Sequence, residues 1–401
     1  MKEHVAVVDL GYGDAGKGTI VDAICATGPV TAVIRFNGGA QAAHNVVTAG
    51  GRHHTFAQFG SGTLQGVPTH LSRFMVVDPL TLAAEAAALG NPFDLLSVDE
   101  DALLATPWHR AANQVRERRR GGGRHGSCGL GVGQTMEYAL THAAAPRVGD
   151  VRSPALLRRR LTAVRDDLTS EFGPLDAPPV ADVVDAFLAF GQVVSIVDSS
   201  FLDGLLTTGP CVFEGAQGVL LDEWRGWHPY TTWSTTTFDN VGLLCDSFVR
   251  LGVVRTYTTR HGAGPFVTAA DLDLPEAHNG VGEWQGAFRV GHFDAVAHRY
   301  AVEVAGGVDA LAVTHLDRVP PALRICTSYD LDGSRWERIV PGPHRDLAYQ
   351  AGLTSLLTRA RPGDCYRPDD WAAAVGAELG APVLIESHGP RTSDKRVLSL
   401  V

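Results

Sequence analysis

Short apolar runs alternate with longer segments of mixed polarity along most of this chain. Continuous runs of valine, isoleucine and leucine are typical of strands that are covered on both faces of a parallel sheet. Segments with helical periodicity, such as residues 19–25, separate these runs and indicate crossover connections. The pattern predicts an α/β fold with a large, mostly parallel central sheet flanked by helices. The expected strands comprise residues 5–10, 30–36, 73–77, 193–197, 211–214 and 311–315.

Two segments depart from this alternation. Residues 105–150 are rich in arginine, glycine and alanine, and we expect a loop and helix excursion there. Residues 265–290 are rich in glycine and acidic residues, which predicts a long functional loop. The chain after residue 365 predicts a final helix and strand, then a turn at residues 387–391. Length alone permits one large domain or two smaller ones, and we expect residues 1–401 to form a single domain, in which no internal repeat is apparent.

Composition narrows the class of protein. The chain has 401 residues, of which 45% are hydrophobic, and a formal net charge of −10. An acidic protein repels phosphates, so nucleic acid and anionic membranes are not expected partners, and the basic cluster at residues 116–124 is interpreted as a solvated loop. The six cysteines are scattered without a C-x-x-C pair, and no apolar run is long enough to cross a bilayer. These features predict a cytoplasmic protein in a reducing environment.

A glycine-rich segment with one lysine follows the first expected strand and precedes the first expected helix. It reads Gly11-Tyr-Gly-Asp-Ala-Gly-Lys-Gly18. Backbone N–H groups at the start of a helix bind anions and Lys17 adds a positive charge, so the segment predicts a P-loop-like phosphate site. Gly18 stands where the common P-loop pattern has a serine or threonine that binds Mg²⁺, which makes Asp14 the candidate metal ligand. The alternative is a glycine-rich turn without a ligand, in which Asp14 and Lys17 would lack a partner.

A histidine ends the small-residue segment after the second expected strand. The segment reads Arg35-Phe-Asn-Gly-Gly-Ala-Gln-Ala-Ala-His44. Ligands in open α/β sheets bind at the carboxyl ends of the strands. An isolated histidine is more often a structural residue, but beside a phosphate loop His44 becomes a candidate catalytic residue. Asp14 and His44 are interpreted as a pair in which one accepts a proton and the other donates to a developing oxyanion.

These two segments resemble the motifs G-D-E-G-K-G-K-I-V-D and R-x-x-G-G-x-N-A-G-H of the adenylosuccinate synthetase family. Further segments resemble motifs of that family in the same order along the chain. They are Phe213-Glu-Gly-Ala-Gln-Gly218 (F-E-G-A-Q-G), residues 228–232 with Thr236 and Thr237 (Y-P-Y-V-T…T-T), Thr259-Arg-His-Gly-Ala-Gly-Pro-Phe266 (T-R-V-G-A-G-P-F), residues 314–317 (T-K-L-D) and residues 387–391 (S-T-G-P-D-R). The resemblance covers nearly the whole chain and implies the α/β fold of the family.

The resemblance implies a GTP- and Mg²⁺-dependent ligase that forms a carbon–nitrogen bond. The family phosphorylates the 6-oxygen of IMP and then displaces the phosphate with the amino group of aspartate. Phosphorylation makes the oxygen a good leaving group, and the step needs a base, a donor to the oxygen and a clamp on the phosphoryl group. Matching positions imply catalytic roles for Asp14, His44 and Gln217, with Asp14 and the carbonyl of Ala43 as metal ligands. The implied nucleotide-binding residues are Gly13, Ala15, Gly16, Lys17, Gly18, Thr314, Asp317, Ser387 and Gly389.

The acceptor end of the implied site departs from the family pattern. The family holds the 5′-phosphate of IMP with a G-T-T-G-R-G-I-G-P loop, which here reads Gly126-Ser-Cys-Gly-Leu-Gly-Val-Gly-Gln134. Leu130 replaces the arginine of that loop, and Gln41 replaces an asparagine of the family's second motif. We therefore expect this pocket to bind a dianionic phosphate poorly, unless Arg124 or Arg147 compensates.

The amine end departs as well. The family clamps the carboxylates of aspartate with threonines and several arginines, whereas residues 282–291 read GEWQGAFRVG. Arg289 is the one arginine of this segment, and Trp284 and Phe288 are new. Because both substrate ends change while the activation residues stay, the sequence favours small-molecule substrates other than IMP and aspartate. The candidate substrate-binding residues are Gln41, Ser127, Cys128, Thr232 and Arg289.

Three alternatives stay open at this point. The first is an ordinary adenylosuccinate synthetase with an unusual phosphate pocket. The second is a catalytically inactive GTP-binding protein, which would have no need of Asp14 and His44. The third is a kinase that stops at the phosphorylated oxo compound. The resemblance also implies a homodimer.

Overall fold

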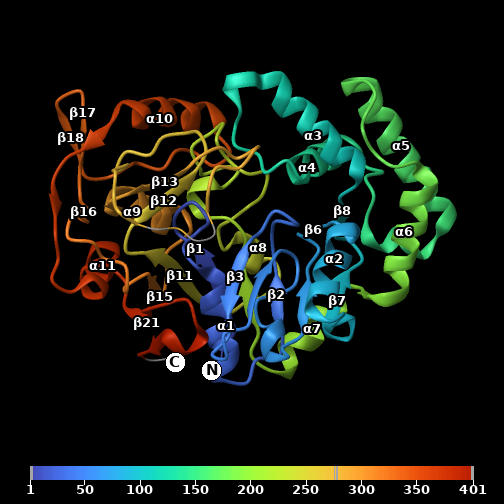
Figure 1. Cartoon of the computed structure of the whole chain (residues 1–401), viewed down its shortest axis with the longest axis horizontal. Coiled ribbons are helices and arrows are strands. Elements are labelled where there is room, and N and C mark those ends of the chain that lie inside the picture. The colour runs from blue at the N-terminus through green and yellow to red at the C-terminus, as the bar shows by residue number, and fades with distance from the viewer. Residues whose placement is uncertain (1–2, 275, 277–278, 399–401) are drawn as a thin grey trace.

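The computed structural model describes residues 3–274, 276 and 279–398. A ten-stranded sheet runs through its centre in the order β22-β21-β15-β11-β1-β10-β2-β5-β7-β9 (Figure 1). Neighbouring strands pair in parallel, except that β22 pairs antiparallel with β21 at one edge. The predicted α/β fold with a mostly parallel central sheet is confirmed. The strands of this sheet are β1 (Val5–Asp9), β2 (Val33–Arg35), β5 (Thr69–Leu71), β7 (Leu96–Asp99), β9 (Ser195–Val197), β10 (Val212–Glu214), β11 (Val249–Arg255), β15 (Ala310–Thr314), β21 (Val383–Ser387) and β22 (Lys395–Val397).

Shorter strands and the helices surround this sheet. The shorter strands are β3 (His44–Val47), β4 (His53–Phe56), β6 (Val76–Val77), β8 (Leu103–Leu104), β12 (Thr258–His261), β13 (Phe288–Gly291), β14 (Phe293–Asp294), β16 (Ile325–Cys326), β17 (Tyr329–Leu331), β18 (Ser334–Trp336), β19 (Arg361–Pro362) and β20 (Cys365–Tyr366). The helices are α1 (Lys17–Thr27), α2 (Pro79–Leu89), α3 (Pro107–Arg120), α4 (Val132–Thr141), α5 (Pro154–Phe172), α6 (Val180–Val193), α7 (Ser199–Thr208), α8 (Asp239–Gly242), α9 (Ala295–Val304), α10 (Leu347–Arg359) and α11 (Trp371–Leu379).

Strand β1 lies in the middle of the sheet, and the phosphate loop follows directly from it. Val5 pairs with Val212 of β10 on one side and with Val249 of β11 on the other. All residues of β1 are buried, which is why the strand is a continuous apolar run. Parallel pairing brings the carboxyl ends of β1, β2, β10, β11 and β15 to one edge, where the loops of the candidate site gather.

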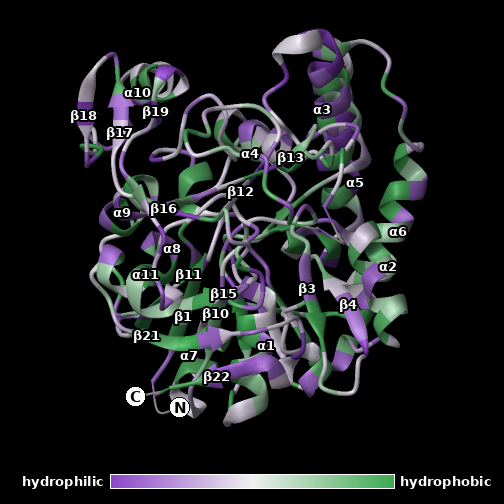
Figure 2. Ribbon diagram, turned by 60° about the vertical axis from the view of Figure 1, so that its left-hand side comes forward, coloured by the Kyte–Doolittle hydropathy of each residue, from purple (hydrophilic) through white to green (hydrophobic). Residues whose placement is uncertain are grey.

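Helices cover both faces of the sheet. Ile20 and Ile24 of α1 pack with Val5 and Val7 on one face. The alternate residue of β1, Val8, belongs to a core that includes residues of α9 and α11 on the other face. Successive strand residues point to opposite faces, so one apolar strand supplies both layers. Figure 2 shows the hydrophobic residues concentrated in the central strands and the hydrophilic ones toward the outer loops and helices.

Helices α2, α3, α5 and α6 contribute to a second core beside β7, and Figure 1 shows them in light blue, teal and green. The expected excursion at residues 105–150 consists of α3, α4 and the glycine loop between them. The interpretation of residues 116–124 as a solvated loop is wrong for its first part, because Arg116–Arg120 complete α3. Arg116 there forms ion pairs with Glu137 and Glu171, so the cluster is partly neutralised within the protein.

Two small sheets, β14-β16-β20 and β18-β17-β19, lie in the C-terminal part of the chain. Cys326 of β16 and Cys365 of β20 are paired in register and form a disulfide. The interpretation of all six cysteines as scattered thiols is therefore wrong for this pair, since 39 positions separate them and no spacing motif marks them. Within the described part of the chain, the helices are all too short or too polar to span a bilayer.

The expected strand at residues 73–77 is displaced. Strand β5 enters the main sheet at Thr69–Leu71, whereas Val76–Val77 forms β6 and pairs with β8 in a separate sheet. Strand β11 carries arginines at positions 250 and 255, and the sequence analysis missed it. Buried polar residues such as Thr69 and His70 interrupt the apolar pattern, because their partners lie elsewhere in the chain.

Candidate functional site

The loop between β1 and α1 folds around the carboxylate of Asp9. Oδ1 of Asp9 accepts a hydrogen bond from the N–H of Gly11 at 2.7 Å, and Oδ2 accepts one from Ala15 at 2.7 Å. Gly13 and Gly16 have φ values of 110° and 92°, which L side chains rarely adopt. The donors of the predicted phosphate loop are therefore partly engaged by an anion that the chain itself supplies.

Lys17, the first residue of α1, points back into this loop. Its Nζ lies 3.3 Å from Oδ2 of Asp9 and donates to the carbonyl of Gly13 at 2.7 Å. The lysine side chain is 1% exposed, and a buried ammonium group needs such partners because burying a charge is costly. Lys17 is a predicted site residue, whereas Asp9 is not. The available signal was a carboxylate at the end of an otherwise apolar strand.

His44 begins β3 and lies against the start of α1. A Cβ on Gly18 would come within 2.7 Å of the Cβ of His44, which explains the glycine at that position. Nδ1 of His44 lies 2.7 Å from Oε1 of Glu214, and both side chains are buried. Glu214, at the end of β10, also accepts hydrogen bonds from the N–H of Ser61 at 2.9 Å and from its hydroxyl. The engaged Nδ1 leaves Nε2 as the nitrogen that would face a ligand.

The charged and polar groups around Glu214 favour its ionised form. Burial acts to raise the pKa of Glu214, but the facing charges of His44 and Arg35 and the hydroxyl of Ser61 lower it to about 2. Burial lowers the pKa of His44, and Glu214 opposes this shift. The sequence analysis missed Glu214 as a functional residue, although it lies in the segment that also contains Gln217.

The loop after β10 packs on the phosphate loop and carries Gln217. Gln217 has a φ of 59°, and a Cβ on Gly13 would lie 3.2 Å from its Cα. A Cβ on Gly218 would collide with the carbonyl oxygen of Gly11 at 2.3 Å. This close approach of two backbones explains why glycines are needed in both loops.

Two glutamine amides converge beside these loops. Oε1 of Gln217 and both amide atoms of Gln41 are buried without a hydrogen-bond partner among the described residues. A Cβ on Gly38 would lie 3.3 Å from Nε2 of Gln41 and 3.6 Å from Oε1 of Gln217. Buried amides normally have partners, so these atoms mark a place where a polar ligand fits.

Asp14 lies on the phosphate loop and faces the ends of β11 and β12. His44 instead faces the end of β10. Its backbone carbonyl accepts a hydrogen bond from Nε of Arg255, the last residue of β11. Its Oδ2 lies 3.6 Å from Nε2 of His261, the last residue of β12. Burial raises the pKa of Asp14, and Arg255 and His261 oppose the rise. The structure thus pairs Asp14 with His261 and His44 with Glu214, whereas the sequence analysis paired Asp14 with His44.

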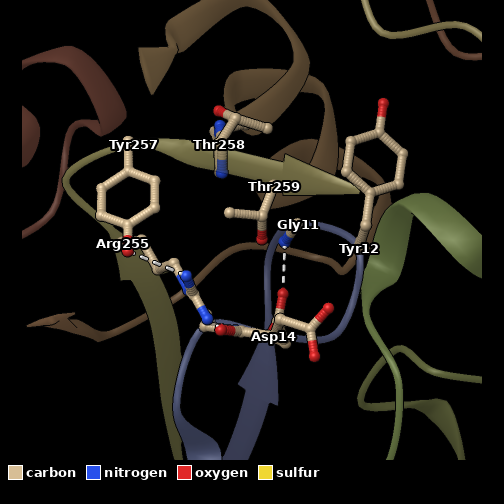
Figure 3. Close-up of a pocket in the computed structure, with 10 residues that line it drawn as sticks. Gly11, Tyr12, Asp14, Arg255, Tyr257, Thr258 and Thr259 are labelled. Atoms are coloured by element: carbon tan, nitrogen blue, oxygen red, sulfur yellow. Dashed lines mark hydrogen bonds between the residues drawn. The ribbon is translucent and has the colours of Figure 1, made fainter. Parts of the chain in front are cut away.

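A small pocket that opens to solvent lies between the phosphate loop and β12. Its lining includes Asp14, Arg255 and Thr258. Figure 3 shows Arg255 and Tyr257 on one side of Asp14 and Tyr12 on the other, with the threonines of β12 above. The pocket is therefore polar and lies beside the carboxylate that the sequence analysis singled out.

The residues expected at the nucleotide lie at the carboxyl ends of β15 and β21. Oγ1 of Thr314 donates to the carbonyl of Ala15 at 2.7 Å and ties β15 to the phosphate loop. Ser387 ends β21 and donates to the carbonyl of Gly389 at 3.2 Å. Asp317 follows β15, and its side chain is 33% exposed. These positions share one sheet edge with the phosphate loop.

The glycine loop at residues 126–134 packs against the turn at residues 282–286. A Cβ on Gly129 would come within 2.8 Å of the indole of Trp284. The guanidinium carbons of Arg118 and Arg124 lie 5.1 and 5.6 Å from the centre of the Trp284 ring. Arg124 also donates to the carbonyl of Glu283 at 2.9 Å. The two segments that depart from the family pattern thus form one contact, called here the tryptophan contact, made by Trp284, Gly129, Arg118 and Arg124.

The other substrate candidates lie around this contact and near the histidine segment. Oγ of Ser127 donates to Oδ1 of Asn113 at 2.9 Å. Cys128 follows in the glycine loop, and burial raises the pKa of its thiol. The N–H of Thr232 donates to the backbone of the short helix after β10 at 2.8 Å. Ala43 is exposed just before β3.

Arg289 lies in β13 and is engaged by the backbone of the turn that follows β12. Its Nη2 donates to the carbonyls of Gly262 at 2.6 Å and Gly264 at 3.0 Å. Its guanidinium also lies 5.5 Å from the ring centre of Phe266. The residue therefore shapes this turn, and its Nε is buried without a partner among the described residues.

The residues present fit GTP and Mg²⁺. The glycine loop beside Lys17 suits the phosphates of a nucleotide, and the unsatisfied amides of Gln41 and Gln217 suit a polar acceptor beside it. No group of three or more His, Cys, Asp or Glu side chains suited to a metal occurs among the described residues. A lone carboxylate such as Asp14 is what Mg²⁺ needs, because this ion takes most of its ligands from phosphates and water.

Comparison with known proteins gives consistent matches along the chain. The family model described as adenylosuccinate synthetase matches residues 6–353. Adenylosuccinate synthetase of Thermobifida fusca (strain YX) is 33% identical, with 96% of each chain covered. That of Synechococcus sp. (strain WH7803) is 34% identical, with 92% of this chain and 88% of the relative covered.

Two solved structures share the fold. The fully ligated adenylosuccinate synthetase from Plasmodium falciparum matches with a TM-score of 0.85 and 20% identity over 98% of this chain and 99% of that one. The cyanophage S-2L succinoaminodeoxyadenylate synthetase, bound to dGMP and to dATP as an energy donor, matches with a TM-score of 0.67 and 20% identity over 100% of this chain and 96% of that one. The adenylosuccinate synthetase family consists of GTP-dependent carbon–nitrogen ligases that use Mg²⁺. The match over most of the chain shows that this protein belongs to the adenylosuccinate synthetase family.

Proposed function

We propose that this protein phosphorylates an oxo group of a small-molecule acceptor with GTP and then replaces the phosphate with an amine, on substrates other than IMP and aspartate. The observation that carries the proposal is the tryptophan contact. The segments that hold the phosphate of IMP and the carboxylates of aspartate in the family are here packed on each other around Trp284. The loops of the activation residues keep Asp14, Lys17 and His44, although Ala15, Thr19 and Ala43 stand where the family motifs have glutamate, lysine and glycine.

In this proposal Asp14 accepts a proton from the acceptor and His44 presents Nε2 to the oxygen that is phosphorylated. Burial raises the pKa of Asp14, which makes its carboxylate a stronger proton acceptor. Glu214 orients His44 through Nδ1. Gln217 offers an unsatisfied amide to the acceptor. Mg²⁺, when bound, neutralises charge on the phosphoryl group and would be held by Asp14 and the carbonyl of Ala43.

The pocket expected at the acceptor suits an acceptor molecule that carries a group other than a dianionic phosphate. Leu130 occupies the position of the family's arginine in the glycine loop. Arg124 is engaged by Trp284 and by the carbonyl of Glu283, and Arg147 donates to the carbonyl of Asp101. Losing charge-assisted contacts of this kind costs about 1.5–3 kcal/mol each. The cyanophage relative carries dGMP and dATP, so this fold accommodates more than one acceptor and energy donor.

The test is a panel of nucleosides, nucleotides and small oxo-acids, each combined with amines, GTP and Mg²⁺, with phosphate release as the readout. We expect amine-dependent phosphate release with a pair other than IMP and aspartate, and very weak turnover with that pair. Phosphate release without amine consumption would indicate a kinase, and GTP binding without cleavage by any pair would indicate an inactive binder. Either result would contradict the proposal.

The second candidate function is that of an ordinary adenylosuccinate synthetase. It is favoured by the identity of 33% to a relative of that name over 96% of both chains. Rapid turnover of IMP, L-aspartate and GTP would establish it and remove the claim of altered substrates. A homodimer is part of both proposals, and size-exclusion chromatography with light scattering would test it.

A further inference from the structure

The turn between β21 and β22, at residues 387–394, contacts two other parts of the expected nucleotide site. On one side, Oγ1 of Thr19 in the first turn of α1 donates to the carbonyl of Pro390 at 3.2 Å. On the other side, the N–H of Leu316, which follows β15, donates to the carbonyl of Ser387 at 3.1 Å. This segment, called here the β21–β22 turn, therefore joins the helix of the phosphate loop to the segment after β15.

Lys395, the first residue of β22, binds two carbonyls at the tip of this turn. Its Nζ donates to the carbonyl of Gly389 at 2.7 Å and to that of Arg391 at 2.8 Å. An ammonium group carries three N–H donors, so it can hold both carbonyls at once. Because these carbonyls lie on either side of Pro390, Lys395 fixes the shape of the tip, which contains the expected nucleotide-binding residue Gly389.

Asp394 packs against the same tip. Its Oδ2 accepts a hydrogen bond from the N–H of Arg391 at 2.8 Å, and its backbone carbonyl accepts one from the N–H of His388 at 2.9 Å. A Cβ on Gly389 would lie 2.5 Å from Oδ2 of Asp394, so this close approach requires the glycine. The tip is thus packed on Asp394 and closed by the charge-assisted hydrogen bonds of Lys395.

Other residues attach the β21–β22 turn to the fold without Lys395. Oγ1 of Thr392 donates to Oδ2 of Asp22 in α1 at 2.5 Å and to the carbonyl of Val47 at 3.2 Å. Oδ1 of Asp22 accepts a hydrogen bond from Nε2 of Gln65 at 2.8 Å. A substitution at Lys395 is therefore expected to alter the tip of the turn while its attachment to α1 stays.

The charge of Lys395 depends on pH in the neutral to alkaline range. Burial lowers the pKa of Lys395 to about 8, and the charges of Asp394, Asp22 and Asp317 oppose this shift. These carboxylates act on the ammonium group from the turn itself, from α1 and from the segment after β15. His315 of that segment also interacts with Lys395, and burial keeps the pKa of His315 well below its ordinary value. The ammonium group is thus charged below about pH 8 and loses its proton as the pH rises through that value.

We infer that Lys395 shapes the β21–β22 turn for nucleotide binding, and that nucleotide affinity falls when its ammonium group loses its proton. The inference rests on the proposed function, in which GTP is the phosphoryl donor, and it assigns a positioning residue outside the predicted site residues. A charged donor binds a carbonyl about twice as strongly as a neutral one. A neutral amine therefore leaves the tip less ordered, and the nucleotide must order it at a cost in binding free energy.

Calorimetry with GTP and Mg²⁺ tests the inference, because it measures the dissociation constant and the stoichiometry separately. Lys395→Met keeps the length of the side chain and removes the donor, so the dissociation constant should rise about three- to tenfold at neutral pH, the size of one hydrogen bond. The control is Arg396→Met, at the next position of β22, where the side chain is 71% exposed and the constant should not change. A residue that only stabilised the fold would lower the stoichiometry of Lys395→Met and leave the constant unchanged, which would overturn the inference.

The pH dependence separates the charge of Lys395 from its shape. Ionisation of GTP itself affects all variants alike, so the readout is the ratio of the dissociation constants of Lys395→Met and wild type. This ratio should be largest below about pH 7 and should approach one above about pH 9, on either side of the titration of Lys395. Lys395→Arg stays charged, so its ratio to Lys395→Met should not vary with pH. A constant ratio between Lys395→Met and wild type would overturn the inference.

Failure of the inference and failure of the proposed function give different results. A wild-type protein that binds no GTP removes the proposed function and, with it, the inference. Equally tight GTP binding by wild type and Lys395→Met means that only the inference has failed. With the substrates that the panel identifies, the KM for GTP should rise in Lys395→Met, while kcat and the KM for the acceptor stay unchanged.

Discussion

The activation centre, made by Asp9, Lys17, His44, Glu214 and Gln217, and the tryptophan contact are held by different kinds of interaction. In the activation centre, charged groups are buried and meet charged or backbone partners at 2.7–3.3 Å. In the tryptophan contact, a half-buried indole lies against a glycine and two guanidinium groups. Replacing one member of a buried ionic network leaves its partner charged and unpaired, which destabilises the protein strongly. Replacing one residue of an aromatic contact leaves no buried charge unpaired and costs less folding free energy. For this reason we expect the substrate ends of such a ligase to change more readily than its activation chemistry.

The largest expected effect comes from breaking the activation centre at Lys17. Lys17→Ala removes the ammonium group that faces Asp9 and that we expect to contact the phosphates, and it leaves the carboxylate buried without its charged partner. We expect amine-dependent GTP cleavage to fall by at least about 10²-fold, measured as kcat/KM with the substrates from the panel. Arg338→Ala, at an exposed pair with Glu303, is the control. Activity within a few-fold of wild type would mean that this loop does not hold the phosphates.

The second-largest effect is expected from breaking the hydrogen bond between Glu214 and His44. Glu214→Gln should lower kcat about 10–100-fold, as does loss of a group that orients an active-site imidazole. The pKa of Glu214 is about 2 in the folded protein and about 4.3 when unfolded. A lowered folded pKa means that the carboxylate stabilises the protein above about pH 4.3, and that this contribution is lost as the pH falls toward 2.

Urea unfolding at several pH values measures that contribution. The stability difference between wild type and Glu214→Gln should be largest near neutral pH and should shrink as the pH falls through this window. A difference that does not vary with pH would mean that Glu214 is not held ionised by its neighbours.

A smaller effect is expected from restoring a charge at the altered acceptor end. Leu130→Arg should lower the dissociation constant for phosphorylated nucleosides about tenfold, because one charge-assisted hydrogen bond contributes about 1.5–3 kcal/mol. Calorimetry with IMP and inosine measures the change, and Leu130→Met is the control. If IMP and inosine gain affinity equally, the glycine loop does not face the acceptor's phosphate.

The smallest effect is expected at Trp284, and it tests whether the tryptophan contact acts independently of the activation centre. Trp284→Ala removes the ring between Arg118 and Arg124 and should raise the KM for acceptor and amine several-fold, while the KM for GTP stays unchanged. Loss of two cation–π contacts at a partly exposed site costs about 1–2 kcal/mol of folding stability. Trp284→Phe keeps an aromatic ring and should show less of both effects in steady-state kinetics and thermal unfolding. A parallel rise in the KM for GTP would contradict the separation.

The parts of the fold and site that could be predicted are those marked by residues adjacent in the sequence. Strands β1, β10 and β15 are uninterrupted apolar runs and were placed within a residue or two. The glycines of the phosphate loop are required by positive φ values and close backbone approach, so their pattern is visible in the chain itself.

Features that depend on long-range partners were not predicted. Asp9 and Glu214 are single carboxylates at strand ends, and their roles become visible only when Lys17 and His44 lie beside them. The pairing of Asp14 with His261 joins positions 14 and 261, which no local pattern connects. The prediction for β5 was displaced for the same reason, since Nδ1 of buried His70 pairs with Ser97 of the neighbouring strand, which no local pattern shows.

The carboxylate of Asp9 inside the phosphate loop also bears on how fast a nucleotide is captured. Because it already balances the charge of Lys17, the loop presents little positive field to an approaching triphosphate. Electrostatic steering then adds little to the association rate, and we expect that rate to vary only weakly with ionic strength. We expect nucleotide entry to depend instead on how readily the carboxylate of Asp9 releases the N–H groups of Gly11 and Ala15, because both donors are engaged before any ligand binds.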